Sequence, residues 1–272
     1  MTTTTQKQTP PINIPTVIAI GALVMSLNVA IHEGIHALAC LAVGADLSVY
    51  TALSVECSGG TTAGSKFVSL SAPLANLIIG AAVYWLLRRS TGASDEVWYT
   101  GWLFMLVNWL AGAGYLLFSG VAGVGDIAAV LEGWQPAWLW RGLTLLGGAV
   151  LYLGVIAVAL RLFGTRVGGT DDERISRAQK LAVWSYVGVV IPVVLASLFH
   201  PAGFTGLPAV AGMAAAVLGQ SPLLWMMQWF RAKSFPKRNG VPLQIRPNGA
   251  IPAAAIIVAF LYGVGWGRGI FF

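Results

Sequence analysis

The stretch HEGIHALACLAVGA runs from residue 32 to residue 45, inside an apolar segment that opens at Pro15. It places two histidines and a glutamate within five positions of a chain that has only three histidines. Ionisable groups inside a membrane segment cost several kcal/mol unless a partner compensates their charge. The stretch therefore predicts a membrane helix that carries a functional site.

The composition around this stretch is that of a polytopic membrane protein. Of the 272 residues, 57% are hydrophobic and only 10% are charged, which leaves too little polar surface for an ordinary soluble globule. A span needs roughly 20 apolar residues to cross about 30 Å of hydrocarbon. Seven runs meet this length or come close to it: 15–43, 67–87, 98–118, 139–163, 181–199, 207–230 and 250–266. We expect an all-α bundle of six or seven transmembrane helices in a lipid bilayer, with H-E-x-x-H on the first.

The charged residues predict how the bundle is oriented. If the spans alternate, thirteen of the sixteen Lys and Arg residues fall on one side, which the positive-inside rule identifies as the cytoplasm. The N-terminus is then cytoplasmic and the C-terminus lies outside. The net charge of +6 comes from short loops at the ends of spans, so we expect no nucleic-acid partner.

Three segments between or before the spans have a distinct composition. Residues 1–14 are Thr-rich and interrupted by proline, which predicts a disordered cytoplasmic tail. The loop 45–66 contains CSGGTTAGS, which favours irregular backbone or a short hairpin. Residues 119–135 place several glycines before Asp126, which indicates a bent or re-entrant piece.

The H-E-x-x-H pattern predicts a metal site. Positions four apart share a helix face, so His32 and His36 present two imidazoles to one point, with Glu33 beside it. Two imidazoles and a third protein ligand suit a catalytic Zn²⁺, whose open position takes a water with a pKa near about 7. Glu33 would then act as the general base that takes the proton of that water. The alternative is that the three side chains only satisfy one another within a bundle.

The third ligand must come from the remaining histidine or from an acidic residue that reaches the same depth. The candidates are His200, Asp46, Glu56, Asp126 and Glu132. Asp126 is favoured, because the Gly-rich break before it allows the backbone to turn a short side chain inward. Its span also runs outward like the first one, which puts Asp126 on the same side of the membrane as the two histidines.

Two other residues near the motif have competing interpretations. Asn28, one turn before His32, either orients that histidine or forms a hydrogen bond across helices. Cys40, one turn after His36, is expected to be a small packing residue. Two cysteines are too few to indicate a disulfide framework, and a bridge from Cys40 to Cys57 does not follow from their spacing.

Three segments resemble the site-2 protease family of intramembrane zinc metalloproteases, of the peptidase M50 type. HEGIHALACLAVGA is similar to its H-E-x-x-H-A helix, and SAPLANLIIGAAV (71–83) to its Gly-Pro-Leu-Ala-Asn-Leu segment. GVGDIAAVL (123–131) resembles its Asp-Gly segment, although isoleucine replaces the glycine. The resemblance implies that Asp126 is the third zinc ligand, that Asn76 belongs to the helix beside the site, and that Asn108 corresponds to an asparagine upstream of the aspartate.

The resemblance covers about residues 20–132 and divides the chain into a metalloprotease-like membrane core, 15–136, and additional transmembrane helices, 137–272. It implies a metallopeptidase that hydrolyses a peptide bond within or near a membrane segment of a protein or peptide substrate. Two alternatives stay open. The site chemistry also suits a membrane zinc hydrolase acting on a lipid, and an inactive scaffold or transport protein would carry the same residues.

Overall fold

The computed structural model describes residues 11–168, 171–231 and 242–272. The predicted disordered tail, residues 1–14, lies mostly outside these ranges. At its end, Asn13 caps the first helix: its Oδ1 accepts a hydrogen bond from the backbone N–H of Thr16 at 3.0 Å. Pro15 suits the first turn of that helix, where a backbone N–H has no helical partner.

The expected helical membrane bundle is confirmed. Six apolar segments of the described chain are long enough to cross a bilayer: α1 (Ile14–Ala42), α2 (Thr62–Arg89), α3 (Asp95–Ala122), α5 (Ala137–Val167), α6 (Asp171–Leu198), and a broken segment formed by α7 (Leu207–Gly219), α8 (Pro222–Trp225) and η1 (Met226–Arg231). The seventh predicted span, 250–266, is a shorter apolar helix made of α9 (Ala250–Phe260) and the π-helical turn η2 (Leu261–Trp266). The chain is an integral membrane protein.

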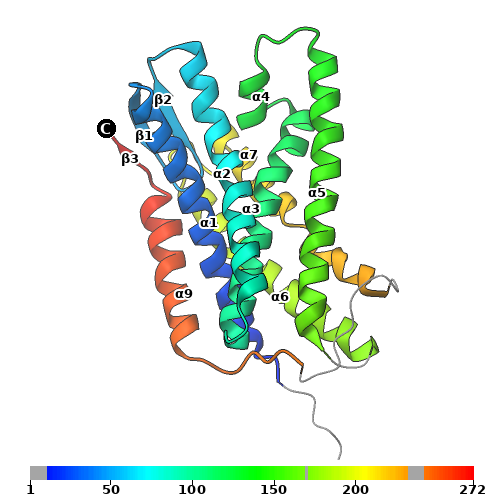
Figure 1. Cartoon of the computed structure of the whole chain (residues 1–272). Helices are drawn as coiled ribbons and strands as arrows, with labels where there is room; N and C mark the ends of the chain where they lie inside the picture. The colour runs from blue at the N-terminus through cyan, green and yellow to red at the C-terminus, as the bar shows by residue number, and fades with distance from the viewer. Residues whose placement is uncertain (1–10, 169–170, 232–241) are drawn as a thin grey trace, which may run out of the picture.

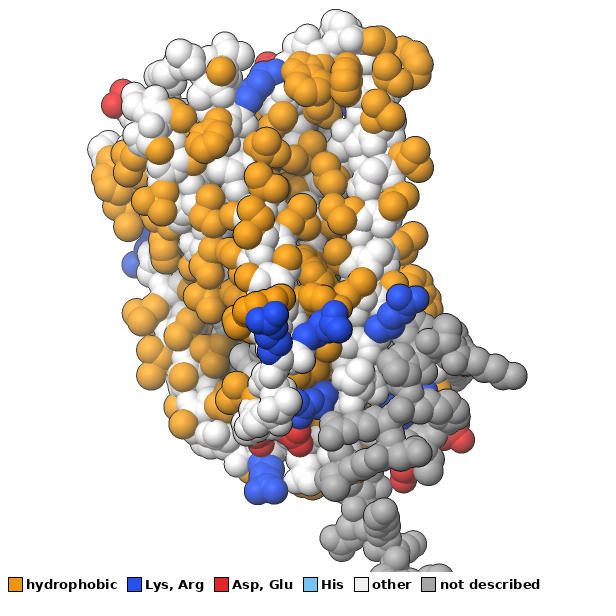
Figure 2. Space-filling view, in the orientation of Figure 1, with side chains coloured by type: hydrophobic (Ala, Val, Ile, Leu, Met, Phe, Trp, Pro, Cys, Tyr) orange, Lys and Arg blue, Asp and Glu red, His pale blue; other side chains and the backbone are white. Residues whose placement is uncertain are grey.

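The two ends of the bundle differ in structure and in charge (Figures 1 and 2). The hairpin end carries β1 (Asp46–Tyr50), β2 (Val55–Ser58), β3 (Ile270–Phe271) and the short helix α4 (Asp126–Leu131). At the basic end lie the start of α1 and most of the Lys and Arg side chains visible in Figure 2. A band of hydrophobic side chains separates the two ends, as expected for a surface that contacts lipid.

A small antiparallel sheet closes the hairpin end. Of the two forms expected for residues 45–66, the structure has the hairpin: β1 pairs with β2, with Asp46 opposite Ser58. Gly44, whose φ of 71° is readily adopted only by glycine, turns the chain from α1 into β1. On its other edge β1 pairs with β3, with Tyr50 opposite Ile270, so the sheet order is β2-β1-β3.

Helix α1 is the central element, because it packs against α2, α3, α6 and α9. Its contact with α6 is made by glycines on both helices. A Cβ at Gly188 would overlap the carbonyl oxygen of Ile18, and a Cβ at Gly21 would overlap that of Ser185. Small residues of this kind let the backbones of membrane helices approach closely. Because the hydrophobic effect does not drive helices together within lipid, van der Waals packing between them provides much of the stability.

We predict that Gly188→Ala destabilises the bundle by about 2 kcal/mol, because the added methyl must push α1 and α6 apart. Thermal unfolding of detergent-purified protein, followed by tryptophan fluorescence, measures the effect. The control is Gly154→Ala on α5, where a Cβ meets nothing within 4 Å. Equal stability of the two variants would contradict this account of the α1–α6 contact.

Candidate metal centre

The structure brings His32, His36 and Asp126 together near the hairpin end of the bundle. The Nε2 atoms of His32 and His36 each lie 3.3 Å from Oδ2 of Asp126. One donor atom from each residue lies within 4.8 Å of the other two, so the group is compact enough to hold a metal ion. Both histidines are buried, at 4% and 7% exposure, which places the group inside the protein.

The orientation of each imidazole is fixed by a hydrogen bond at its Nδ1 atom. Nδ1 of His36 lies 2.8 Å from the backbone carbonyl oxygen of Val68, which can only accept, so Nδ1 carries the proton. Nδ1 of His32 lies 2.6 Å from Oδ1 of Asn76. Neutral imidazoles in these tautomers keep a lone pair on Nε2, the atom that faces Asp126.

A chain of hydrogen bonds determines which end of the Asn76 amide faces His32. Nδ2 of Asn108 donates to the backbone carbonyl of Phe104 at 2.8 Å, which directs Oδ1 of Asn108 toward Asn76. Nδ2 of Asn76 donates to that oxygen at 2.9 Å, which leaves Oδ1 of Asn76 for His32. The last acceptor in the chain, the carbonyl of Phe104, cannot donate a hydrogen bond. It therefore fixes the orientation of the Asn108 amide, which in turn fixes that of the Asn76 amide.

The resulting donor set fits a metal cation. Two imidazole nitrogens and one carboxylate oxygen converge, and with neutral imidazoles all three are acceptors. Nε2 of His32 is buried without a hydrogen-bond partner that satisfies it. Three acceptors facing one another repel unless a cation lies between them, and two nitrogens with one oxygen suit Zn²⁺. The second nitrogen of each histidine is bonded to an oxygen, as is usual for histidines that bind metals.

Asp126 reaches the two histidines because it is not part of α3, which ends one turn before it. The helix stops at Ala122, and Gly123 and Gly125, with φ of 70° and 90°, reverse the chain before α4 begins at Asp126. The carboxylate oxygens of an ionised Asp126 are then available as ligands.

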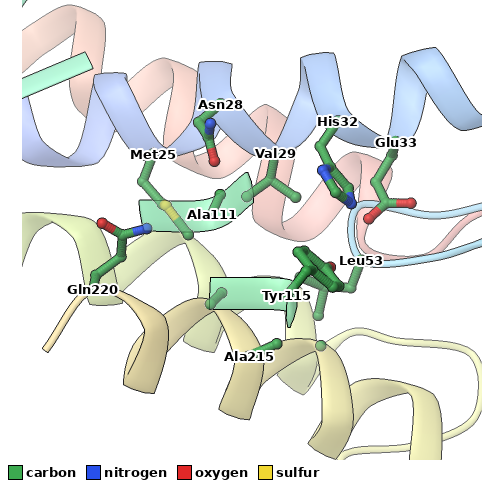
Figure 3. Close-up of a pocket in the computed structure, with 12 residues that line it drawn as sticks. Met25, Asn28, Val29, His32, Glu33, Leu53, Ala111, Tyr115, Ala215 and Gln220 are labelled. Carbon is green, nitrogen blue, oxygen red and sulfur yellow. The ribbon is translucent and has the colours of Figure 1, made fainter. Parts of the chain in front are cut away.

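Glu33 and Tyr115 border the same space. Glu33 is 5% exposed and shares with the two histidines a cavity of about 220 Å³, walled by the hairpin, α2, α3 and α7. The ring of Tyr115 stacks on that of His32, with centroids 4.9 Å apart and an angle of 11° between the planes. Figure 3 shows Tyr115 and Glu33 on the two sides of His32. A buried carboxylate thus lies beside the three side chains within one cavity.

The other candidates for a third ligand lie away from the cluster. His200 accepts a hydrogen bond from the N–H of Ala202 and lies 3.2 Å from Oγ of Ser54. Asp46 and Glu56 are exposed on the hairpin strands, and Glu132 follows α4 as its C-cap.

The hydrogen bond that orients His32 comes from Asn76 and not from Asn28. Its amide instead lines a cavity below the cluster, and its Nδ2 has no hydrogen-bond partner among the described residues. Asn76 and Asn108, both buried, form the chain that orients His32. Of the three asparagines, two therefore act on the histidine and one faces the cavity.

The expectation that Cys40 is only a packing residue is wrong. Cys40 and Cys57 form a disulfide with a Cα–Cα distance of 6.0 Å, which ties β2 to the last turns of α1. The pairing arises because the hairpin folds back over the end of α1. Sequence spacing carries no information on that fold-back, so the bridge could not be inferred from it.

Three groups that shape the centre were not predicted. The carbonyls of Val68 and Phe104 hold the histidine and asparagine orientations, and backbone atoms leave no signature in a sequence. Tyr115 had a weak signal, as the one polar ring in the apolar run LAGAGYLLF (110–118). Its stacking on His32 depends on how α1 and α3 pack.

These residues lie in a chain that belongs to the Peptidase M50B-like family, whose model matches residues 13–201. The match confirms the resemblance drawn from the sequence and extends it through α5 and α6. The segment from α7 onward lies beyond the matched residues. No curated protein and no solved structure matches the chain.

We predict that purified protein contains about one zinc per chain and that Asp126→Ala and His36→Ala lose it. Asn76→Ala should weaken zinc binding by about 10- to 100-fold, because His32 loses the bond that orients it. Elemental analysis after dialysis against graded chelator measures both effects.

The control is His200→Ala, which removes the remaining histidine at the same end of the bundle. Zinc retained in Asp126→Ala, or lost in His200→Ala, would contradict the assigned ligand set.

Proposed function

We propose that the protein is an intramembrane zinc metallopeptidase that hydrolyses a peptide bond within or near a membrane segment of its substrate. His32, His36 and Asp126 would hold Zn²⁺, and Glu33 would be the general base. The observation that carries the proposal is the convergence of two imidazole nitrogens and a carboxylate oxygen beside a buried carboxylate, inside a membrane bundle. Membership of a peptidase family supports the same conclusion.

Bound Zn²⁺ supplies Lewis acidity, which polarises the scissile carbonyl and makes a water molecule acidic enough to attack it. Glu33 takes a proton from the attacking water and delivers it to the leaving amine. The water oxygen becomes part of the new carboxylate, and the C–N bond breaks. The walls around Glu33 exclude bulk water, which strengthens each charge interaction in the site.

The location of the cavity favours a membrane-embedded substrate over a soluble one. His32 and Glu33 lie within a helix that spans the bundle, and the cavity that they share is walled by three further helices. A peptide must present its backbone at this depth, and an intact helix keeps its carbonyls bonded to its own N–H groups. The substrate segment therefore has to unwind locally beside Glu33.

Two features favour an orientation with the hairpin end outside the cytoplasm. The basic residues gather at the opposite end (Figure 2), as the positive-inside rule expects of the cytoplasmic side. The Cys40–Cys57 disulfide lies at the hairpin end, and disulfides persist in oxidising compartments outside the cytoplasm. The site would then open toward the outer face.

We predict that Glu33→Gln abolishes peptide hydrolysis, by at least about 10³-fold, while zinc content stays near one per chain. Glutamine keeps the shape of glutamate but cannot accept the proton of the attacking water. Cleavage of an unstructured protein such as casein in detergent, with parallel zinc analysis, separates the two readouts. Persistent cleavage by Glu33→Gln would remove Glu33 from the mechanism.

For orientation, we predict that a membrane-impermeant maleimide labels Ala63→Cys in intact cells and does not label Gly92→Cys. Ala63 is exposed at the hairpin end, and Gly92 is exposed in the α2–α3 connection at the basic end. The native cysteines give no background, because both are in the disulfide. Labelling only at position 92 would reverse the proposed orientation.

A further inference from the structure

Tyr115 on α3 carries a hydroxyl group that forms no hydrogen bond with the described residues. Unlike the hydroxyls of Ser26 and Ser119, which are enclosed without a partner, it keeps accessible surface. The Tyr115 side chain lines the cavity of about 220 Å³ that Glu33 shares with the two histidines, and also a narrower cavity beside it. The free hydroxyl therefore faces the space in which we propose that the reaction takes place.

Other tyrosines of the bundle have their hydroxyls bonded to protein. Tyr99, Tyr152 and Tyr262 each donate to a backbone carbonyl of another segment, at 3.0, 2.6 and 2.6 Å. This is the usual arrangement, because a tyrosine hydroxyl inside a protein normally finds a hydrogen-bond partner. Tyr115 departs from it, as expected of a donor that is kept for a bound molecule.

The position of Tyr115 relative to the reacting groups is set by its ring. The ring stacks on the imidazole of His32 with centroids 4.9 Å apart. The negative charges of Asp126 and Glu33 both act on the Tyr115 hydroxyl. Figure 3 shows the Tyr115 ring next to His32, with Glu33 close by on the same side of α1. A hydrogen-bond donor, the proposed base and the proposed ligands thus border one space.

Two serine hydroxyls also belong to residues that line this cavity. Oγ of Ser54 is already within hydrogen-bond distance of Thr51 and His200, at 3.0 and 3.2 Å. Ser69 has no hydrogen-bond partner among the described residues, but its short side chain can rotate. The stacked ring of Tyr115 holds its hydroxyl in one place, and a donor that is fixed beforehand stabilises developing charge best.

Peptide hydrolysis requires such a donor at one particular atom. When water attacks the scissile carbonyl, an electron pair moves onto the carbonyl oxygen, which becomes negatively charged. The carboxylates of Glu33 and Asp126 cannot donate to it, whereas a tyrosine hydroxyl keeps its proton at neutral pH and can. When the C–N bond breaks, the electron pair returns to the carbonyl, and the hydroxyl retains its proton.

We propose that Tyr115 is a catalytic residue, whose hydroxyl donates a hydrogen bond to the carbonyl oxygen of the scissile bond as that oxygen becomes negatively charged. The proposal rests on the proposed peptidase function. It separates two parts of one side chain: the ring packs on His32, and the hydroxyl acts on the substrate.

Tyr115→Phe tests this separation, because phenylalanine keeps the ring and removes only the hydroxyl. Mass spectrometry first identifies the casein bond that the full-length, zinc-loaded protein in detergent cleaves most often, and a peptide containing that bond is used for kinetics. We expect kcat to fall by about 10²- to 10³-fold in Tyr115→Phe. KM should change by less than about 2-fold, and zinc should stay near one per chain.

Binding provides a readout that does not depend on turnover. A phosphinic analogue of the same peptide carries a tetrahedral, negatively charged group in place of the scissile bond. Calorimetry should show that Tyr115→Phe weakens its binding by about the same factor as kcat/KM. The uncleaved peptide should bind equally well to Glu33→Gln with and without Tyr115→Phe, whereas a merely structural role of Tyr115 would weaken both ligands.

Tyr152→Phe is the matched control, since it removes a tyrosine hydroxyl that donates to the carbonyl of Gly219 and does not line the catalytic cavity. Its kcat and its affinity for the phosphinic peptide should equal those of the wild type. Ser69→Ala tests the competing donor. Loss of kcat in Ser69→Ala with wild-type kcat in Tyr115→Phe would assign the donor to Ser69 and overturn the proposal.

The remaining outcomes distinguish the two proposals. Wild-type kcat in Tyr115→Phe, or a fall in kcat that only follows loss of zinc, would overturn the role of the hydroxyl and leave the peptidase intact. A zinc-loaded wild type that cleaves no bond in casein would overturn the proposed function, and the role of Tyr115 with it.

Discussion

The centre depends on one electrostatic constraint: nitrogens of His32 and His36 and a carboxylate oxygen of Asp126 face one another within 3.3 Å of that oxygen. A cation compensates such an arrangement best when the geometry of the ligands is fixed before it binds. The carbonyl of Val68 and the Asn76–Asn108–Phe104 chain supply that fixed geometry. Both arrive from α2 and α3, so the packing of these helices on α1 sets the orientation of the imidazoles.

Much of the fold followed from the sequence, because the relevant forces act over one helix turn or one span. Runs of apolar residues predicted the helices, and the H-E-x-x-H spacing placed two imidazoles and a carboxylate on adjacent faces of α1. The glycines before Asp126 predicted a break, and the structure has a chain reversal there, with two residues at positive φ. Each of these inferences used residues that are close in the sequence.

The features of the fold and the site that the sequence did not predict depend on contacts between segments that are distant in the sequence. The bond from His32 to Asn76 joins residues on different helices, and the family resemblance placed Asn76 beside the site without specifying this contact. The disulfide required the hairpin to fold back, and the cavity beside Glu33 required α7 to pack near α1 and α3. The hydrogen bond that Nε2 of the buried Gln220 donates to the backbone carbonyl of Val107 on α3 is a further example. Neither periodicity nor composition contains such information.

The pairing of β1 with β3 has a consequence for the order of folding. Tyr50 leaves the ribosome early and its partner Ile270 leaves after every helix of the bundle, so the pair forms only once the intervening helices are in place. Leu53, Ser54 and Val55, which lie at or beside the connection between β1 and β2, line the cavity that Glu33 shares with the two histidines. The strand that completes this sheet therefore joins it last, after synthesis of every helix that lines the cavity.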